Sequence, residues 1–213
     1  MSLESRPPPV PTVLRILQGI RQLVSNIAAG MNYAAGWGFI FCSAFVTFDV
    51  LARNFGGFSS RATTEITSYL LAFGIAWGLA HALAMRAHIR IDVLVNRLPL
   101  AARQFLHAFA LLLMTGFALF IAWSAWHLVD ESILFNAKDT SALSIPLVIP
   151  QGLWFIGIAM LAAMSLCLLA EVLCLLLMGR PADVDALLGP RGYQEETAEA
   201  LEAAGAAKPE AKP

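Results

Sequence analysis

Charged residues are scarce in this sequence. Asp, Glu, Lys and Arg together make up 14% of its 213 residues, and 58% of the residues are hydrophobic, whereas a soluble globular domain carries about a quarter charged residues. So few ionic groups could not cover the surface of a water-soluble protein, so the composition favours a protein that faces lipid. The formal net charge is −1, and we therefore expect no nucleic-acid partner.

Motifs for enzyme chemistry are also lacking. The three cysteines, Cys42, Cys167 and Cys174, all lie in apolar runs and form neither a disulfide framework nor a CxxC metal pair, so we interpret them as packing residues. The sequence has no Gly-rich phosphate loop, no HExxH motif and no convincing Ser/His/Asp set. We therefore expect no enzyme activity, no cofactor and no metal site.

What the sequence does contain is four long windows without any charged residue. They are Gln22–Phe48, Ile66–Met85, Gln104–Val129 and Thr140–Ala170, and each has the length of about 20 residues that a membrane-spanning helix needs. Because the backbone in lipid must satisfy its own hydrogen bonds, each span should be a helix. The predicted fold is therefore all-α and integral to the membrane, with four transmembrane helices at about 29–51, 65–86, 102–128 and 150–178, which together form a domain over 29–178.

The two ends of the chain differ from this central domain. Prolines at 7, 8, 9 and 11 cannot form the apolar core of a secretory signal, so we interpret the first apolar run as a retained span. Within residues 1–28, the segment Thr12–Ile27 has apolar residues at helical spacing and Arg15 and Arg21 on the other side. This pattern predicts an amphipathic helix in the cytoplasmic interface, with a plain extension of the first span as the alternative. Residues 179–213 are rich in Ala, Glu and Pro, and we expect a disordered cytoplasmic tail.

The distribution of Lys and Arg predicts the orientation. Nine arginines precede the first span, lie in the second loop or follow the fourth span, whereas three basic residues lie on the opposite side: Arg53, Arg61 and Lys138. Since cytoplasmic loops carry the excess of basic residues, both termini and the second loop are predicted to be cytoplasmic.

Two sets of residues within the spans are candidates for specific contacts. Gly74 and Gly78 have GxxxG spacing, and Gly30, Ala34 and Gly38 repeat at the same interval in the first span. Small residues let membrane helices approach closely, so these stripes predict packing either between the first two spans or against another protein. His81 and His107 lie near the cytoplasmic ends of the second and third spans, and paired imidazoles could hold a haem axially. A haem-binding redox anchor is therefore the alternative function, and interfacial histidines are the simpler interpretation.

No predicted span has a charged residue at its centre, and none is interrupted by polar residues at the middle of the membrane. Substrate sites in transporters are typically formed by such broken helices. We therefore expect that this chain does not move a polar solute alone. Arg53 ends the first span and Glu65 starts the second on the same side, so an Arg53–Glu65 ion pair is expected there.

Three segments resemble the small membrane subunit of TRAP transporters, the DctQ-type permeases. The first segment, Phe48–Pro99, contains an arginine after span one, an acid at the start of span two and an HI-x-[IV]-D motif after span two: Arg53, Glu65, His88, Ile89 and Asp92. The second feature is Trp123, and the third is Thr140–Gly157, which resembles a T-x-x-L-x-[IT]-P entry to span four. The resemblance covers roughly Met31–Met178. It departs at Thr64, where many relatives have a second acid, and this puts in doubt any role that needs both acids.

The resemblance implies a role in the uptake of organic acids, driven by a sodium gradient, in the inner (plasma) membrane of a bacterium. It implies two partners, a large permease subunit that carries the substrate and sodium sites and a periplasmic substrate-binding protein. The small subunit would then be a scaffold in the lipid bilayer. We single out seven residues with an expected structural or subunit-interface role: Arg53, Glu65, Gly74, Gly78, His88, Arg90 and Asp92. Of these, the last three lie in the segment Arg86–Asp92, which either caps helices or docks the large subunit.

Overall fold

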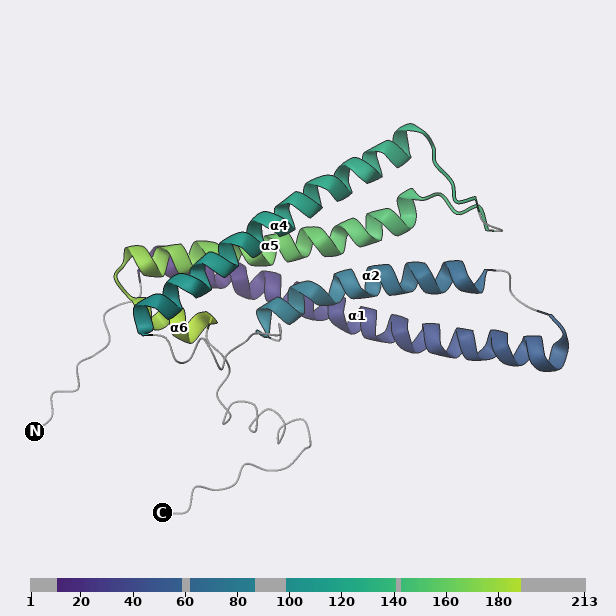
Figure 1. The fold of residues 1–213 in the computed structure, drawn as a ribbon, viewed down its shortest axis with the longest axis horizontal. Coiled ribbons are helices and arrows are strands. Elements are labelled where there is room, and N and C mark those ends of the chain that lie inside the picture. The colour runs from purple at the N-terminus through teal and green to yellow at the C-terminus, as the bar shows by residue number, and fades with distance from the viewer. Residues whose placement is uncertain (1–10, 59–61, 87–98, 141–142, 189–213) are drawn as a thin grey trace, which may run out of the picture.

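The computed structural model describes residues 11–58, 62–86, 99–140 and 143–188, and these residues are helical apart from their short connections (Figure 1). The helices are α1 (Thr12–Gly56), α2 (Thr63–Ala84), α4 (Leu100–Leu134), α5 (Val148–Leu177) and α6 (Pro181–Leu188). Within the described ranges no strand is formed, and the one β-like contact is an isolated bridge between Lys138 and Pro146. The all-α prediction is confirmed.

Four of the helices are long and apolar enough to cross a membrane: α1, α2, α4 and α5. Each contains most of one predicted span, so the prediction of four transmembrane helices is also confirmed. At a rise of 1.5 Å per residue, the 22 residues of α2 extend about 33 Å, which matches the ~30 Å hydrocarbon core of a bilayer. The other three helices are longer, with 45, 35 and 30 residues.

Proline and glycine set several of the helix ends. Pro11 and Pro99 directly precede α1 and α4, where a missing N–H costs nothing because the first turn of a helix has no acceptor for it. After α1 and α5, Gly57 and Gly179 both adopt a left-handed backbone with φ of 66°. This conformation ends a helix and suits glycine because it has no Cβ.

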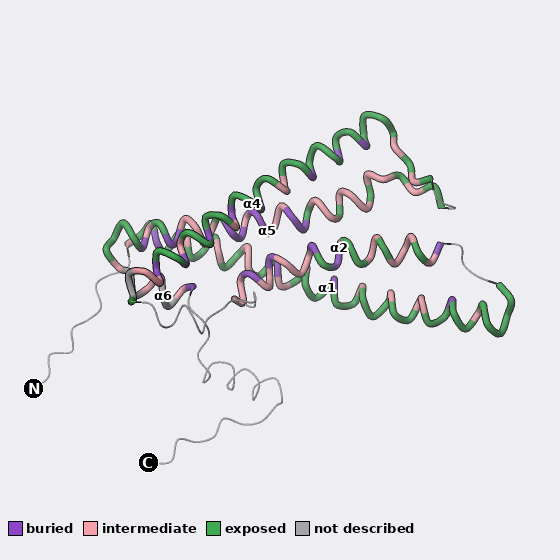
Figure 2. Tube along the Cα trace, in the orientation of Figure 1, coloured by how far each residue is buried: buried purple, intermediate pink, exposed green. Residues whose placement is uncertain are grey.

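The bundle is built around α5. This helix packs against α2, α4 and α1, while α1 also packs along α2. In Figure 2 the buried residues concentrate along α5, and the outer faces of α1 and α4 are largely exposed. Such exposure is expected for helices that face lipid, since the bilayer is the apolar solvent for their outer surfaces.

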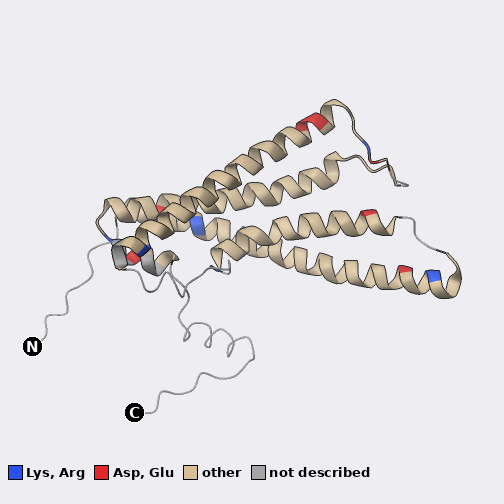
Figure 3. Cartoon of the chain, viewed as in Figure 1, with Lys and Arg blue, Asp and Glu red and all other residues tan. Residues whose placement is uncertain are grey.

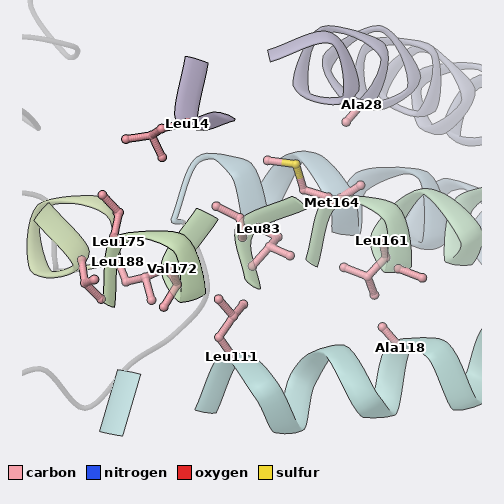
Figure 4. Packing of buried hydrophobic residues seen from close by; sticks show 14 residues of the cluster. Leu14, Ala28, Leu83, Leu111, Ala118, Leu161, Met164, Val172, Leu175 and Leu188 are labelled. Carbon is pink, nitrogen blue, oxygen red and sulfur yellow. The ribbon is translucent and has the colours of Figure 1, made fainter. Parts of the chain in front are cut away.

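The buried apolar cluster runs along the inner face of α5 (Figure 4). Met164 and Val172 of α5 are fully buried, and α1 reaches the cluster with Leu14 and Ala28. Residues from α2, α4 and α6 complete it: Ala80, Leu83, Leu111, Ala118, Val184 and Leu188. The core therefore joins all five helices of the described residues, including the short helix α6.

The structure differs from the sequence-based expectation at both ends of the domain. Residues 12–27 are continuous with the first span in one helix, α1, rather than a separate element; their placement along the cytoplasmic surface stays a prediction. Pro181–Leu188 lies in the segment expected to be disordered, yet it forms α6. Its Val184 and Leu188 are buried, and α6 packs against α4 and α5. These two apolar residues stabilise α6, although the average composition of the tail is polar. Residues 189–213 lie outside the described ranges.

The helices α1, α4 and α5 extend past the level at which α2 ends. Gly157 of α5 lies against Ala76 of α2, and the two helices run in the same direction (Figure 1). Because α2 ends at Ala84 and α5 at Leu177, α5 extends about 12 residues, or ~18 Å, beyond the level at which α2 stops. The beginnings of α1 and α4 and the helix α6 pack around this extension.

Candidate functional site

Charged residues gather toward the two ends of the bundle (Figure 3). We call these the basic end and the acidic end. Among the described residues, the basic end holds Arg15, Arg21, Arg86, Arg103 and Arg180, together with Glu171 and Asp183. The acidic end holds Asp49, Glu65, Asp130, Glu131 and Asp139, together with Arg53 and Lys138. The unequal distribution of charge along the sequence is therefore also a difference in charge between the two ends of the folded bundle.

An ion pair at the basic end joins the first and last spans. The Nε of Arg21 lies 2.7 Å from an Oε atom of Glu171, whose side chain is 3% exposed, while that of Arg21 is 26% exposed. The contact is an ion pair without the alignment of a hydrogen bond. The sequence placed Arg21 on the water-facing side of an amphipathic helix, whereas the structure turns it toward α5. The acid near the end of an otherwise apolar span was the signal for this pair, since a buried carboxylate needs a partner.

The acidic end contains a second ion pair within α1. Arg53 donates to a carboxylate oxygen of Asp49 at 2.8 Å, one turn earlier on the helix, and Asp49 is 2% exposed. The ion pair seen for Arg53 is thus with Asp49, where the sequence suggested Glu65. One carboxylate oxygen of Glu65 is itself buried, and no group among the described residues donates a hydrogen bond to it.

The connection between α4 and α5 is tied to α2 at the same end. The Tyr69 hydroxyl donates to the carboxylate of Asp139. Asp139 in turn donates its N–H to the carbonyl of Ile145 at 3.0 Å, beside the bridge between Lys138 and Pro146. This connection therefore lies over the beginning of α2.

The small-residue stripe of α2 faces α1. A Cβ built on Gly74 would lie 2.6 Å from the ring of Phe39, and one on Gly78 would lie 3.4 Å from the Asn32 side-chain oxygen. From the other side, a Cβ on Gly38 would lie 3.3 Å from the ring of Phe73. These contacts correspond to packing between the first two spans, the first of the two alternatives. Gly30, by contrast, has nothing within 4 Å of a built Cβ.

A backbone contact joins α2 and α5. A Cβ on Gly157 would lie only 2.7 Å from the carbonyl carbon and 2.9 Å from the carbonyl oxygen of Ala76. One turn from this contact, the indole N–H of Trp77 donates to the Leu153 carbonyl at 2.8 Å. The sequence analysis did not single out Gly157, because an isolated glycine in a membrane helix carries no spacing pattern.

Polar side chains join α4 to α5. Thr115 donates to the Leu111 carbonyl at 2.7 Å and lies 3.4 Å from the Ser165 carbonyl. Nearer the acidic end, the Ser132 hydroxyl donates to Gln151 at 2.6 Å. These neutral hydrogen bonds hold two helices together without placing a charge in the membrane.

The two histidines proposed as haem ligands do not face one another. His81 and His107 lie on α2 and α4, which both pack on α5. The contacts of Ala76 with Gly157 and of Thr115 with Ser165 place the two histidines about 11 residues apart along the bundle, or ~16 Å. This separation is too large for two axial ligands of one iron. In the part of the chain that the structure describes, no group of three or more His, Cys, Asp or Glu could hold a metal ion.

The remaining candidates, His88, Arg90 and Asp92, lie between residues 87 and 98, outside the described residues. Arg86, the last described residue before them, has a left-handed backbone with φ of 55° and donates its N–H to the Leu83 carbonyl at 3.1 Å. The chain thus turns sharply away from α2 immediately before this segment.

Comparison with protein families identifies a match over most of the helical bundle. A model of the family described as "Tripartite ATP-independent periplasmic transporters, DctQ component" matches residues 42–175. This range runs from the middle of α1 to the end of α5. No curated protein and no solved structure matches the chain.

Proposed function

Because this chain belongs to the DctQ component family of tripartite ATP-independent periplasmic transporters, we propose that it is the small, scaffolding membrane subunit of such a transporter. It binds a large permease subunit in the inner membrane of a bacterium, and a periplasmic binding protein delivers the substrate to that complex. The substrates are organic acids, and a sodium gradient drives their uptake.

The observation that supports a scaffolding role is the interior of the bundle. Between its two charged ends the described spans are continuous helices without a charged residue. The buried hydroxyls there, on Thr115 and Ser165, donate to carbonyls within the bundle. Transporter sites for anions and sodium use helix ends and unwound backbone at mid-membrane. Substrate and ion binding therefore belong to the large subunit.

The outer surface of the bundle also suits a scaffold. Large apolar side chains are exposed along α1 and α4, among them Trp37, Phe117, Phe120 and Trp123, each more than half exposed. Such side chains pack equally well against lipid tails and against the helices of a partner subunit. The large subunit therefore binds to part of a surface that is already apolar.

The orientation follows from the two charged ends. With the basic end in the cytoplasm, a reporter fused after Arg97 should behave as cytoplasmic and one fused near Lys138 as periplasmic. Paired alkaline phosphatase and fluorescent-protein fusions measure this, because the first is active only outside the cytoplasm and the second fluoresces only inside it. The opposite pattern of activities would reverse the assignment of both ends.

The segment Arg86–Asp92 is proposed to dock the large subunit. We expect Arg90→Ala to reduce the large subunit that co-purifies with the tagged small subunit by about tenfold or more, the effect of losing a central interface residue. His88→Ala should act in the same direction. The measurement is the yield of complex per inserted small subunit after co-expression.

A matched control and a capping variant define this test. Arg97→Ala removes a positive charge from the same loop outside the segment, and complex yield should be unchanged. Asp92→Ala should destabilise the chain by about 0.5–2 kcal/mol through loss of a helix cap. If Arg90→Ala, His88→Ala and their combination all leave complex yield and uptake intact, the segment caps helices and does not dock the partner.

A further inference from the structure

The cavity at the acidic end is a consequence of how α2 and α5 cross. The two helices are in backbone contact where Gly157 meets Ala76, and Trp77, the next residue of α2, donates to Leu153, one turn earlier on α5. Beyond this point they diverge toward the acidic end, as Figure 1 shows. The space between them is a cavity of about 190 Å³. We call it the wedge cavity.

The lining of the wedge cavity is apolar. Its walls are formed by residues of α2, of α5 and of the connection before α5: Ile66, Tyr69, Leu70, Phe73, Ile145, Ile149, Pro150 and Leu153. The pocket is open on one side, and its walls offer water almost no polar partners, so it favours apolar molecules. Left empty, it would forfeit the dispersion contacts of its walls. We therefore expect the wedge cavity to bind an apolar molecule.

The position of the cavity identifies that occupant. Its walls are the first turns of two membrane-spanning helices, so acyl chains of the adjacent leaflet are the apolar molecules that surround it. Two acidic residues are connected to wall residues. Glu65 directly precedes Ile66 in the sequence, and Asp139 is hydrogen-bonded to Tyr69 and Ile145. They mark the level of the lipid headgroups.

The charges at this rim favour one class of headgroup. Glu65 is half-buried and precedes the wall residue Ile66. One of its carboxylate oxygens has no hydrogen-bond donor among the described residues, so the carboxylate brings an uncompensated negative charge to this rim, and an ammonium group would pair with its exposed part. Lys138, next to Asp139, is exposed and can pair with a phosphate. A headgroup that carries both a phosphate and an ammonium matches these two residues better than an anionic headgroup does, because Glu65 and Asp139 would repel net negative charge.

We propose that the wedge cavity is a lipid site that holds part of one acyl chain of a zwitterionic, amine-headgroup phospholipid, with the ammonium at Glu65 and the phosphate at Lys138. This inference does not depend on the transporter role, since the isolated chain forms all of the walls. A bound lipid would keep α2 and α5 apart at the acidic end while Gly157 and Ala76 stay in contact. It would thereby set the angle between the two halves of the bundle.

Retained lipid can be counted by native mass spectrometry of the isolated chain released from vesicles that contain phosphatidylethanolamine and phosphatidylglycerol in equal amounts. We expect one phosphatidylethanolamine molecule per chain, retained at least about fivefold more often than phosphatidylglycerol. Glu65→Gln should abolish this preference. If no lipid is retained, or if retention shows no dependence on headgroup in the unmodified chain, the proposal is wrong.

Two cavity-filling variants locate the site, each with a control on the same helix. Leu70→Phe and Leu153→Phe enlarge opposite walls and should each lower retention at least about fivefold. Leu71→Phe and Ile156→Phe enlarge exposed side chains outside the cavity and should leave retention unchanged. Equal retention in all four variants would place the lipid elsewhere. Loss of lipid from the complex with the large subunit, despite retention by the isolated chain, would show that a partner side chain fills the cavity and would also overturn the proposal.

Discussion

Replacing Arg21 with alanine should destabilise the bundle by about 3 kcal/mol, because it leaves the carboxylate of Glu171 buried without its ion-pair partner. Removing one member of a buried pair typically costs about 3–5 kcal/mol, and the low end applies here because the Arg21 side chain is partly exposed. The free energy of unfolding, from denaturant titration in detergent micelles or bicelles, measures the effect.

Two companion variants test whether the pair itself is responsible. Arg15→Ala removes an exposed charge from the same helix, and its effect should stay within about 0.5 kcal/mol. The double variant Arg21→Glu with Glu171→Arg restores opposite charges and should recover at least half of the loss. An unfolding free energy for Arg21→Ala equal to that of Arg15→Ala would mean that the ion pair does not hold α1 to α5.

Gly157→Ala should also be strongly destabilising, by about 2–3 kcal/mol. Its new Cβ would lie 2.7 Å from the carbonyl carbon of Ala76, and a backbone atom in a packed helix cannot move aside as a flexible side chain can. Overpacking of this kind costs about 1–3 kcal/mol. Since Trp77 follows Ala76 directly, the substitution should also break the hydrogen bond from Trp77 to Leu153, which a change in tryptophan fluorescence would report.

Gly152→Ala is the matched control for this prediction. Both glycines lie on α5, but a Cβ at Gly152 has nothing within 4 Å, so alanine there should stabilise the helix by up to about 1 kcal/mol. The two substitutions should thus have opposite signs. Adding Ala76→Gly to Gly157→Ala should restore only part of the stability, because the carbonyl of residue 76 remains. If both alanines stabilise the chain equally, α2 and α5 are not held in close contact at Gly157.

The sequence was sufficient to predict the four spans because lipid exposure leaves a long-range signal. A run of about 20 residues without charge has few interpretations, and the windows that contain Gly74 and Trp123 coincide with α2 and α4. The direction of the charge asymmetry was likewise visible from the basic residues alone. These are properties of a helix in its solvent, and they need no knowledge of which helix lies beside which.

Pairwise contacts were harder to predict because they depend on the rotation of each helix about its axis. Arg21 fits the polar side of an amphipathic helix equally well whether it faces water or Glu171. Arg53 could reach acids on two helices, and the structure pairs it with Asp49 on its own helix. The helix α6, which contains Val184, was not predicted because the prediction used the average composition of the tail. Its two buried apolar side chains have little weight in that average.

The ion pair between Arg21 and Glu171 has a consequence for how the protein is made. Its two members are 150 positions apart in the chain, so Arg21 is synthesised long before its partner. At about 5–20 residues per second, the ribosome needs roughly 8–30 seconds to reach Glu171. During that interval α1 has no contact with α5. The ion pair can therefore close only after α5 has been synthesised, and a chain truncated before α5 would leave Arg21 without this partner.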